Sequence, residues 1–320
     1  MNTKNSVLCL LSSSKDFVSG ESAARRLGIS RNSVWKAVRA LRADGYEIES
    51  VQNRGYRILG GADVLTTESV ICRLDCDTMW KDIKVYDTVG STNNVLRTMA
   101  AAGAPEGTVV IASHQTSGVG RRGRTFCSPE GTGVYMSMLL RPRLEPSRAV
   151  MITTAAAVSV CEAVSRTTGI KAGIKWVNDI FVDGLKVSGM LTEASIGMEN
   201  SALNYAVLGI GVNVYEPQGG FPDELKGIAG FLCDYCTHGL RGHIAAAILN
   251  AFQSHYPDFE NIPSLYSQLC IVAGRRITVI APGGTYGALA LGTDENCALR
   301  IQLDNGEQKT LNSGEISIRL

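Results

Sequence analysis

The segment from Gly118 to Gly133 reads GVGRRGRTFCSPEGTG and combines closely spaced glycines with Arg121, Arg122 and Arg124. Glycines favour an irregular backbone that can wrap closely around a ligand. Guanidinium groups supply fixed positive charge that suits a phosphate or a carboxylate. The segment therefore predicts a loop that encloses a small anionic molecule. Tails that bind RNA are also rich in glycine and arginine, so the rest of the chain must decide between the two interpretations.

The composition is typical of a folded, water-soluble protein. The chain has 320 residues, enough for two or three domains, and at 45% hydrophobic and 19% charged it does not fit a disordered chain. We expect no transmembrane segment, and the apolar stretch Val7–Leu11 is too short for a secretory signal. Nine cysteines, an odd number without an export signal, predict reduced thiols in a cytoplasmic protein. We also expect that the protein does not bind a membrane.

The charge is distributed unevenly along the chain. Residues 1–60 contain ten lysines and arginines against five acidic residues, a net charge of +5. Because the whole chain carries +1, residues 61–320 carry −4. A basic N-terminal segment on a mildly acidic body indicates a module that binds nucleic acid. An ordinary solvated surface would give the same imbalance.

The N-terminal segment has the pattern of three short helices. The first is expected over Ser6–Ser14. Ser19 can cap a second helix that ends at Gly28. Ser30 can cap a third that runs to about Arg42. The second and third helices are joined only by Gly28-Ile29-Ser30. Two short helices with so short a connection are typical of a helix-turn-helix.

The third predicted helix has an apolar face and a basic face, and two strand-like segments follow it. These segments are Glu47–Gln52 and Gly55–Leu59, joined by a tight turn with Arg54 at its tip. The order of elements predicts a winged helix-turn-helix domain that binds DNA; a three-helix domain that binds another protein is the alternative. The residues expected to contact DNA are Ser30, Arg31, Asn32, Ser33, Trp35, Lys36, Arg39 and Arg54.

The centre of the chain mixes strands and helices, which predicts an α+β fold with a mixed sheet. Strands are expected at Lys84–Thr88, Thr108–Ser113, Gly133–Leu140, Lys171–Val177, Ile180–Val182, Leu185–Glu193 and Tyr205–Val214. Long helices are expected at Thr92–Ala102, Pro146–Thr168 and Gly239–Phe259, and a shorter one from Thr67. The sequence contains no P-loop and no dinucleotide-binding glycine motif, so a nucleotide would be held in another way.

The C-terminal part alternates short apolar strands with turns, which predicts a small β-barrel. Its strands are expected at Arg276–Ile280, Tyr286–Leu291, Ala298–Leu303 and Ile316–Leu320. The segment Gly60-Gly61-Ala62-Asp63 follows the predicted wing, breaks both the helical and the strand patterns and indicates a linker. We therefore predict domains at residues 1–60, 61–270 and 271–320.

A series of motifs in the central part resembles the biotin protein ligases. In order, they are Ser91-Thr92-Asn93, Gln115, the Gly118–Gly133 loop, Lys175-Trp-Val-Asn-Asp179, Lys186–Glu193 and Gly209–Asn213. Together with the N-terminal module, they resemble the bifunctional ligase–repressors of biotin operons. The resemblance covers essentially the whole chain, and the combination of motifs is specific although each motif alone is weak.

The resemblance implies a fold and an activity. The fold would be a winged helix-turn-helix, a central domain like the class II synthetases and an SH3-like C-terminal barrel. The protein would use ATP and Mg²⁺ to convert biotin into biotinyl-5′-AMP. It would then biotinylate a lysine on the biotin carboxyl carrier domain of acetyl-CoA carboxylase. It would also repress biotin genes by binding operator DNA, as a homodimer when the adenylate is bound.

The resemblance also implies roles for individual residues. Catalysis would involve Lys186, Arg121 and Asp179, the last orienting or deprotonating the acceptor lysine. Biotin would be bound by Ser91, Thr92, Asn93, Gln115, Val119, Gly120, Arg121 and Lys186. The nucleotide would be bound by Arg124, Phe126, Lys175, Asn178 and Asn213. No residue is assigned as a metal ligand.

Several of these residues have plainer interpretations. Ser91-Thr92-Asn93 could only cap a helix, and Asp179 could only be a turn residue. Lys175 and Lys186 could be solvated strand residues. Trp176 is expected in the core, and Gly209 and Gly211 could only permit close packing of strands. Cys233 and Cys236 with His238 and His243 have the ligand types of a zinc site, but their spacing favours unligated cysteines.

Three positions depart from the family pattern. Val119 stands where an arginine is common, Phe126 replaces a tryptophan, and Val177 replaces a proline. The loss of a cation at Val119 leaves open a repressor that only senses biotin. A ligase for a related acid, such as lipoate or octanoate, is a further alternative.

Overall fold

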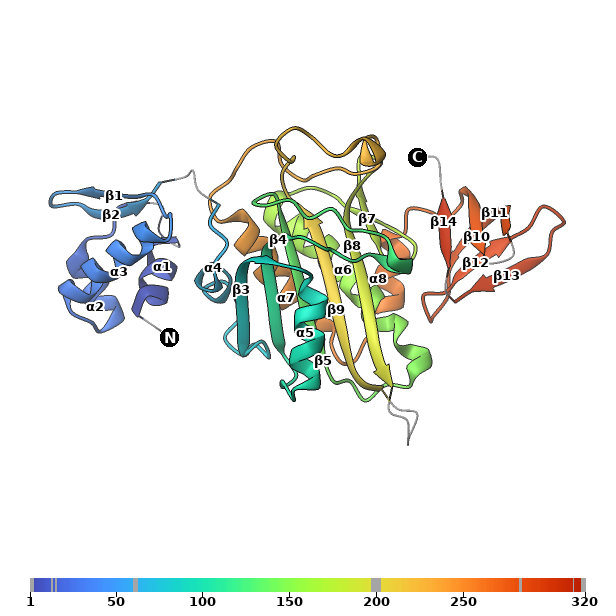
Figure 1. The fold of residues 1–320 in the computed structure, drawn as a ribbon, viewed down its shortest axis with the longest axis horizontal. Coiled ribbons are helices and arrows are strands. Elements are labelled where there is room, and N and C mark those ends of the chain that lie inside the picture. The colour runs from blue at the N-terminus through green and yellow to red at the C-terminus, as the bar shows by residue number, and fades with distance from the viewer. Residues whose placement is uncertain are drawn as a thin grey trace.

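The computed structural model describes residues 3–12, 14, 16–59, 63–196, 203–281, 284–312 and 314–317, with Ile196 described by its backbone only. In Figure 1 a helical N-terminal domain, a large central domain and a small β-domain lie in a row. The winged-helix core and the core of the rest of the chain are separate hydrophobic clusters. The exact domain boundaries stay a prediction.

The N-terminal domain has the predicted order of three helices and a wing. Ser19 and Ser30 cap α2 and α3, since each hydroxyl accepts a backbone N–H three residues on, at 3.0 and 3.1 Å. Gly28 ends α2 in the left-handed conformation, with φ 64°. The elements are α1 Thr3–Ser12, α2 Gly20–Leu27, α3 Arg31–Ala43, β1 Ile48–Val51 and β2 Gly55–Ile58. The winged helix-turn-helix prediction is confirmed.

A seven-stranded mixed sheet forms the centre of the molecule, as predicted. Its strand order is β3-β4-β5-β9-β8-β7-β6. The pairing of β3 with β4 is parallel, and the pairings of the other neighbouring strands are antiparallel. The strands are β3 Asp82–Val89, β4 Thr108–Gln115, β5 Gly133–Leu140, β6 Gly173–Lys175, β7 Asp179–Val182, β8 Leu185–Ile196 and β9 Leu203–Asn213.

Helices cover both faces of this sheet. Long helices α6 and α7 pack against each other on one face, and α5 lies on the other (Figure 1). Strand β5 is therefore buried at every residue. The helices are α4 Thr67–Ile71, α5 Thr92–Ala101, α6 Val150–Thr168, α7 Leu240–His255 and α8 Ile262–Leu269. Single 3₁₀ turns occur at Arg121–Gly123, Pro146–Arg148 and Asp223–Leu225.

One helix prediction is wrong at its C-terminal end, and one helix was not predicted. The helix predicted to reach Phe259 ends at His255, because Pro257 lacks the N–H that another helical turn requires. The chain then forms a further helix, α8, which the sequence analysis missed.

The segment Pro146–Thr168 is long and apolar enough to cross a membrane, but most of it is buried inside the protein. Its apolar character is that of a core helix.

The C-terminal domain is an antiparallel five-stranded sheet with the order β13-β12-β11-β10-β14, which fits the predicted SH3-like barrel. Strand β13 was not predicted because its polar, exposed residues lack an apolar alternation. The strands are β10 Arg276–Ala281, β11 Gly284–Thr293, β12 Leu299–Gln302, β13 Gln308–Leu311 and β14 Glu315–Ser317. The end of the strand predicted to reach Leu320 lies outside the described residues.

Trp176 joins the central and C-terminal domains. Its side chain is 3% exposed, and its indole N–H donates to the carbonyl of Cys297 at 2.9 Å. The prediction that Trp176 belongs to the core is confirmed. Because Trp176 lies between Lys175 and Asn178, this contact brings the C-terminal domain next to the strand ends that carry the candidate catalytic residues.

Candidate active site

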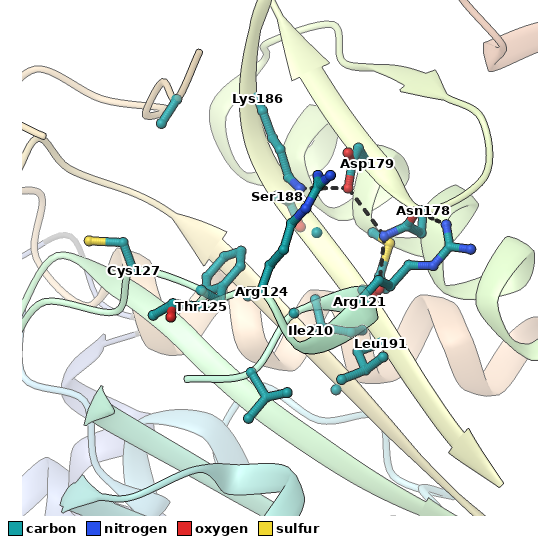
Figure 2. A pocket seen from close by; sticks show the side chains of 18 of the residues that line it. Arg121, Arg124, Thr125, Cys127, Asn178, Asp179, Lys186, Ser188, Leu191 and Ile210 are labelled. Carbon is teal, nitrogen blue, oxygen red and sulfur yellow. Dashed lines mark hydrogen bonds and ion pairs between the residues drawn. The ribbon is translucent and has the colours of Figure 1, made fainter. Parts of the chain in front are cut away.

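A cavity of about 330 Å³ opens at the middle of the sheet, between the Gly118–Gly133 loop and strands β8 and β9. Figure 2 shows Arg121, Arg124, Asn178, Asp179 and Lys186 gathered on one side of it. The sequence-predicted residues in its wall are Ser91, Thr92, Asn93, Gln115, Val119, Gly120, Arg121, Arg124, Phe126, Asn178, Asp179, Lys186 and Asn213. Residues far apart in the sequence thus meet around one small volume.

The start of α5 forms the polar end of the cavity. Gln115 accepts hydrogen bonds from the backbone N–H and the hydroxyl of Thr92, at 2.9 and 3.1 Å. Gln115 therefore satisfies this helix terminus in place of a capping side chain. Ser91 occupies the N-cap position, but no capping bond joins its side chain to the described residues of α5. Ser91 is 3% exposed and lines the cavity, so its position does more than cap the helix.

Asn93 is held from two sides by residues that the sequence analysis missed. Ser137 donates to the Asn93 side-chain oxygen at 2.6 Å. The Asn93 amide donates to Glu193 at 2.7 Å. Gly209 leaves the room for this arrangement, since a β-carbon there would overlap the Asn93 amide. One signal for Ser137 was available: it is the only polar side chain in the strand GVYMSMLL apart from Tyr135.

Two of the cationic groups that line the cavity have partners in its wall. Arg121 donates to the side-chain oxygen of Asn178 at 2.8 Å. Lys186 forms an ion pair with Asp179 at 2.7 Å. Burial lowers the pKa of the Arg121 guanidinium, and the nearby Asp179 opposes that shift. A half-buried charge interacts more strongly with an anion than a fully solvated charge does.

Lys186 is fixed by its strand and by a glycine. Its backbone N–H donates to the carbonyl of Ile228 at 2.8 Å, which places β8 against the 221–229 loop. A β-carbon at Gly189 would lie 3.1 Å from the Lys186 ammonium. The glycine therefore leaves the space in which the ion pair with Asp179 forms. This geometry disfavours the interpretation of Lys186 as a solvated strand residue.

The glycine–arginine loop folds back on itself. Backbone bonds join Gly120 N–H to the carbonyl of Arg124 at 2.7 Å and Phe126 N–H to that of Gly118 at 2.9 Å. Arg122, with φ 56°, adopts the left-handed conformation that non-glycine residues rarely take. Its turn directs the arginines towards the cavity and the C-terminal domain.

Glu315 of the C-terminal domain holds the loop from outside. Its carboxylate accepts two bonds from the Arg124 guanidinium, at 2.7 and 2.9 Å, and lies 3.4 Å from Arg122. Glu315 also lines the cavity. No local pattern could have identified it, since it is 191 residues from Arg124 in the sequence.

The opposite end of the cavity is more apolar. The Phe126 ring lies over Gly211, where a β-carbon would overlap it, and packs edge-on to Tyr135 at a centroid distance of 6.4 Å. Asn213 donates to the carbonyl of Gly230 at 3.0 Å. The interpretation that Gly209 and Gly211 only permit strand packing is therefore incomplete, because each makes room for a cavity side chain.

Lys175 is the one predicted site residue outside the cavity wall formed by the described residues. Its ammonium lies 5.5 Å from the ring centroid of Phe181. Burial lowers the pKa of Lys175, and Asp179 opposes that shift while Lys186 adds to it. Lys175 thus acts on the cavity, in this structure, only through its charge.

The predicted DNA-contacting face of α3 is exposed. Arg31, Asn32, Trp35, Lys36 and Arg39 all point to solvent, and the Arg39 guanidinium lies 5.7 Å from the Trp35 ring centroid. Ser30 and Ser33 are engaged in the helix cap and stand at the edge of this face.

Two other arginines of the domain have structural partners. Arg42, in the last turn of the same helix, donates to the carbonyl of Ile48 at 2.6 Å and to Ser50, and so fastens the wing. Arg54 stacks on Phe17 at 4.3 Å and lies 3.6 Å from Asp16, although its side chain stays 60% exposed. Arg54 therefore stays accessible at the wing, stacked on Phe17.

Among the described residues, no group of three or more histidine, cysteine or acidic side chains is arranged to hold a metal ion. Cys233 is half-buried, and burial raises the pKa of its thiol. Cys236 is exposed. The zinc site considered for this segment thus has no support in the described side chains.

Comparisons with known proteins agree with this architecture. The family model described as "Biotin/lipoate A/B protein ligase family" matches residues 85–213. A model described as "HTH domain" matches residues 3–57, and "Biotin protein ligase C terminal domain" matches residues 272–319. The order of the three matches is the order of the three domains in Figure 1.

Individual proteins extend the similarity to nearly the full chain. The "Bifunctional ligase/repressor BirA" of Bacillus subtilis is 34% identical over 300 residues, 92% of each chain. The protein of the same description from Escherichia coli is 29% identical over 67% of this chain and 64% of its own. The structure of "Biotin protein ligase from Aquifex aeolicus in complex with biotin and ATP" has a TM-score of 0.61 and 27% identity, covering 75% of this chain and 99% of that one. This chain therefore belongs to the biotin protein ligase family, in the bifunctional ligase/repressor group that carries an N-terminal DNA-binding domain.

Proposed function

We propose that the cavity joins biotin to ATP and then transfers the biotinyl group to a lysine of a biotin carboxyl carrier domain, such as that of acetyl-CoA carboxylase. The N-terminal domain makes the same protein a biotin-responsive repressor. The observation that carries the proposal is the convergence of Arg121 and Lys186 on a cavity whose other end is polar and lined by Asn93 and Gln115.

In the first step a biotin carboxylate oxygen attacks the α-phosphorus of ATP, and the bond to pyrophosphate breaks. Two anions must approach each other, which costs free energy unless cations neutralise them. Lys186 stands at the carboxylate and Arg121 at the α-phosphate. Asn93 and Gln115, both fixed by hydrogen bonds, orient the biotin ring system from the far end.

In the second step the lysine amine of the carrier attacks the acyl carbonyl, an amide forms and AMP leaves. A lysine amine has an ordinary pKa near 10.4, so it must lose a proton before it attacks. We assign this role to Asp179, a carboxylate in the cavity wall, which would orient the amine. The biotinyl-AMP must be kept from water until then, which is the role of the Gly118–Gly133 loop.

Mg²⁺ fits this site only as a companion of the ATP phosphates. The carboxylates in the described cavity wall, Asp179 and Glu315, are both engaged in ion pairs. Mg²⁺ commonly keeps several waters and binds through substrate phosphates with few protein ligands. Such an ion supplies positive charge at the phosphates; Asp179 is the protein group that would share it.

The family model covers lipoate as well as biotin ligases, so the acid needs a direct test. Biotin is favoured here by the DNA-binding domain and by the polar end of the cavity around Asn93, which suits a ureido group better than an alkyl chain. A protein that only senses biotin would not need the ion pair between Asp179 and Lys186.

The decisive experiment is acid-dependent exchange of pyrophosphate with ATP, using biotin, lipoate and octanoate. We expect exchange with biotin alone. Lys186→Ala should reduce it by at least about 100-fold, since such electrostatic groups contribute 10²–10³ in rate. Lys309→Ala, an exposed lysine of the C-terminal domain, is the matched control. Tight biotin binding without exchange by the unaltered protein would point to a sensor.

The repressor function predicts a separable effect on DNA. Arg39→Ala should weaken binding to a DNA duplex and lower the slope of log affinity against log salt by about one, the loss of one phosphate contact. Biotin-dependent exchange should be unchanged. Arg276→Ala, an exposed arginine of the C-terminal domain, should leave DNA binding intact. A fall in exchange with Arg39→Ala would contradict the two-module arrangement.

The family assignment supports two further proposals. We expect a cytoplasmic protein, and we expect a homodimer when the adenylate is bound, since two recognition helices would then match two operator half-sites.

A further inference from the structure

Two cysteines from different domains meet at the junction between the winged helix and the ligase domain. Cys9 lies on α1, and Cys72 is the C-cap residue of α4, the first helix of the central domain. Helices α1 and α4 pack together, and the two thiols interact directly. The Arg73 guanidinium lies 3.2 Å from the Cys72 sulfur. Both cysteines are half-buried, so a small reagent can reach them.

The surroundings of the pair favour a thiolate on Cys72. The hydrogen bond from Cys9, aided by the charge of Arg73, lowers the pKa of Cys72 to about 7, although burial opposes the shift. The same hydrogen bond and burial raise the pKa of Cys9. Of the two thiols, Cys72 is therefore the one that ionises more readily. By contrast, burial raises the pKa of Cys161 to about 12 and that of Cys297 to about 11.

Other charged groups at the junction form ion pairs with one another. Lys4 of α1 pairs with Asp44 at 2.9 Å and with Glu68 of α4 at 3.3 Å. Arg73 also donates to the carbonyl of Ser69 at 2.7 Å, which fixes its guanidinium beside Cys72. The Arg73 side chain, held by this hydrogen bond, therefore keeps its positive charge next to the Cys72 sulfur.

We propose that Cys9 and Cys72 are a modification site at which a reversible disulfide fastens the DNA-binding domain to the ligase domain. The oxidant is a low-molecular-weight disulfide. The Cys72 thiolate attacks one of its sulfurs, the reagent's S–S bond breaks, and one small thiolate leaves. Cys9 then gives its proton to solvent and attacks the Cys72 sulfur, which releases the second small thiol. Two protein thiols are oxidised, and the reagent is reduced to two thiols.

The position of the pair gives the disulfide a consequence. The described contacts across this junction are non-covalent, such as that of the Tyr46 hydroxyl with Thr66 at 3.2 Å. A covalent bond would fix α1, and with it the recognition helix α3 that packs on α1, relative to the ligase domain. A dimeric repressor must place two recognition helices at a set spacing. This consequence rests on the proposed DNA binding; the disulfide itself does not.

The test uses the full-length chain. Reduced protein is treated with oxidised glutathione, remaining thiols are alkylated, and a non-reduced tryptic digest is analysed by mass spectrometry. We expect a peptide in which Cys9 is joined to Cys72 and which dithiothreitol separates. Cys9→Ser and Cys72→Ser should each abolish it, whereas Cys76→Ser, an exposed cysteine nearby, should not. Only glutathione adducts, or a link from Cys72 to Cys76, would overturn the assignment.

A second measurement tests the consequence. Binding of a duplex from the promoter of the biotin genes should differ at least fivefold between the oxidised and reduced chain. Biotin-dependent exchange should stay within twofold, and Cys9→Ser should bind equally under both conditions. Equal binding by oxidised and reduced unaltered protein would overturn the control of DNA binding. Failure of the reduced protein to bind any duplex would instead contradict the repressor function, while the peptide map still decides the disulfide.

Discussion

At the scale of single residues, the site depends on glycines, which have no side chain, as much as on the side chains that line the cavity. Gly209 and Gly211 lie two apart on β9, so they face the same side of the sheet. Above one of them lies the Asn93 amide, and above the other the Phe126 ring. The two glycines thus form part of the cavity floor. A polar group lies over one of them and an aromatic group over the other.

This arrangement predicts that the two glycines affect different substrates. Gly211→Ala would push the Phe126 ring away, and overpacking of this kind costs about 1–3 kcal/mol. We expect ATP to bind at least about fivefold more weakly, with biotin affected less. Gly209→Ala should have the reverse pattern, because it displaces Asn93. Isothermal titration with each ligand separates the two effects.

The control for these variants is Gly287→Ala in the C-terminal domain, where the nearest atom to a new β-carbon is 3.6 Å away. It should bind both ligands normally. If Gly211→Ala weakened biotin and ATP equally, Phe126 would not be a contact of the nucleotide.

At the scale of elements, the glycine–arginine loop depends on the C-terminal domain. The side chains of Arg122 and Arg124 are exposed, yet Glu315 holds Arg124 through two bonds and also engages Arg122. The carboxylate comes from β14, which pairs with β10 in a different domain. The barrel therefore has a role at the cavity, although it has no catalytic group of its own.

Removing this carboxylate charge should loosen the loop. An exposed ion pair contributes about 0.2–1 kcal/mol, and the two-bond geometry favours the upper end. Glu315→Gln should therefore speed trypsin cleavage at Arg121–Arg124 by about two- to fivefold in the ligand-free protein. Asp304→Asn removes a comparable pair with Arg276 in the same domain and should not change this rate. Equal cleavage of Glu315→Gln and unaltered protein would show that the loop is held by its own backbone bonds.

The sequence predicted those elements whose cause is local. Caps such as Ser19 and Ser30, with Gly28 at a helix end, act within three or four residues and are visible in the sequence. Strand β13 and the bond from Arg124 to Glu315 depend on partners far along the chain. No single-sequence pattern carries that information, so these parts of the fold and the site could not be predicted.

The candidate site divides in the same way. The motif residues that line the cavity were predicted, mostly through the family resemblance. The residues that position them, Ser137, Glu193 and Glu315, were not, because each acts across the sheet or between domains. The role of Lys175 stays a prediction: its motif suggested a ligand contact, and in the described structure its ammonium lies beside Phe181, outside the cavity wall.

At the scale of the whole molecule, the chain is attached to the ligase domain within a few residues of the end of the winged helix. The predicted linker is residues 60–63, of which residues 60–62 lie outside the described residues; its last residue, Asp63, does not behave as a solvated linker residue. Asp63 is buried, with its side chain 2% exposed. It accepts bonds from the Tyr215 hydroxyl at 2.7 Å and from the Arg241 backbone at 3.0 Å. Arg241 in turn donates to Ser113 on β4 at 3.0 Å.

This buried ion pair fixes the point at which the chain enters the ligase domain, and its loss should be costly. Asp63→Ala would leave the Arg241 charge buried without its carboxylate, which costs about 3–5 kcal/mol. Denaturant unfolding of the ligase domain should show this loss. Asp223→Ala removes an exposed pair with Lys226 and should change stability by less than about 1 kcal/mol.

The double variant Asp63→Leu with Arg241→Met separates stability from geometry. Apolar side chains of similar size can replace a buried ion pair with little loss, so we expect most of the stability to return. The bonds to Tyr215 and Ser113 would still be missing, and the chain would no longer enter the ligase domain at a fixed point. Biotin-dependent exchange should then recover while DNA binding stays weaker than in the unaltered protein. Recovery of both would mean that the junction of α1 with α4 alone positions the DNA-binding domain.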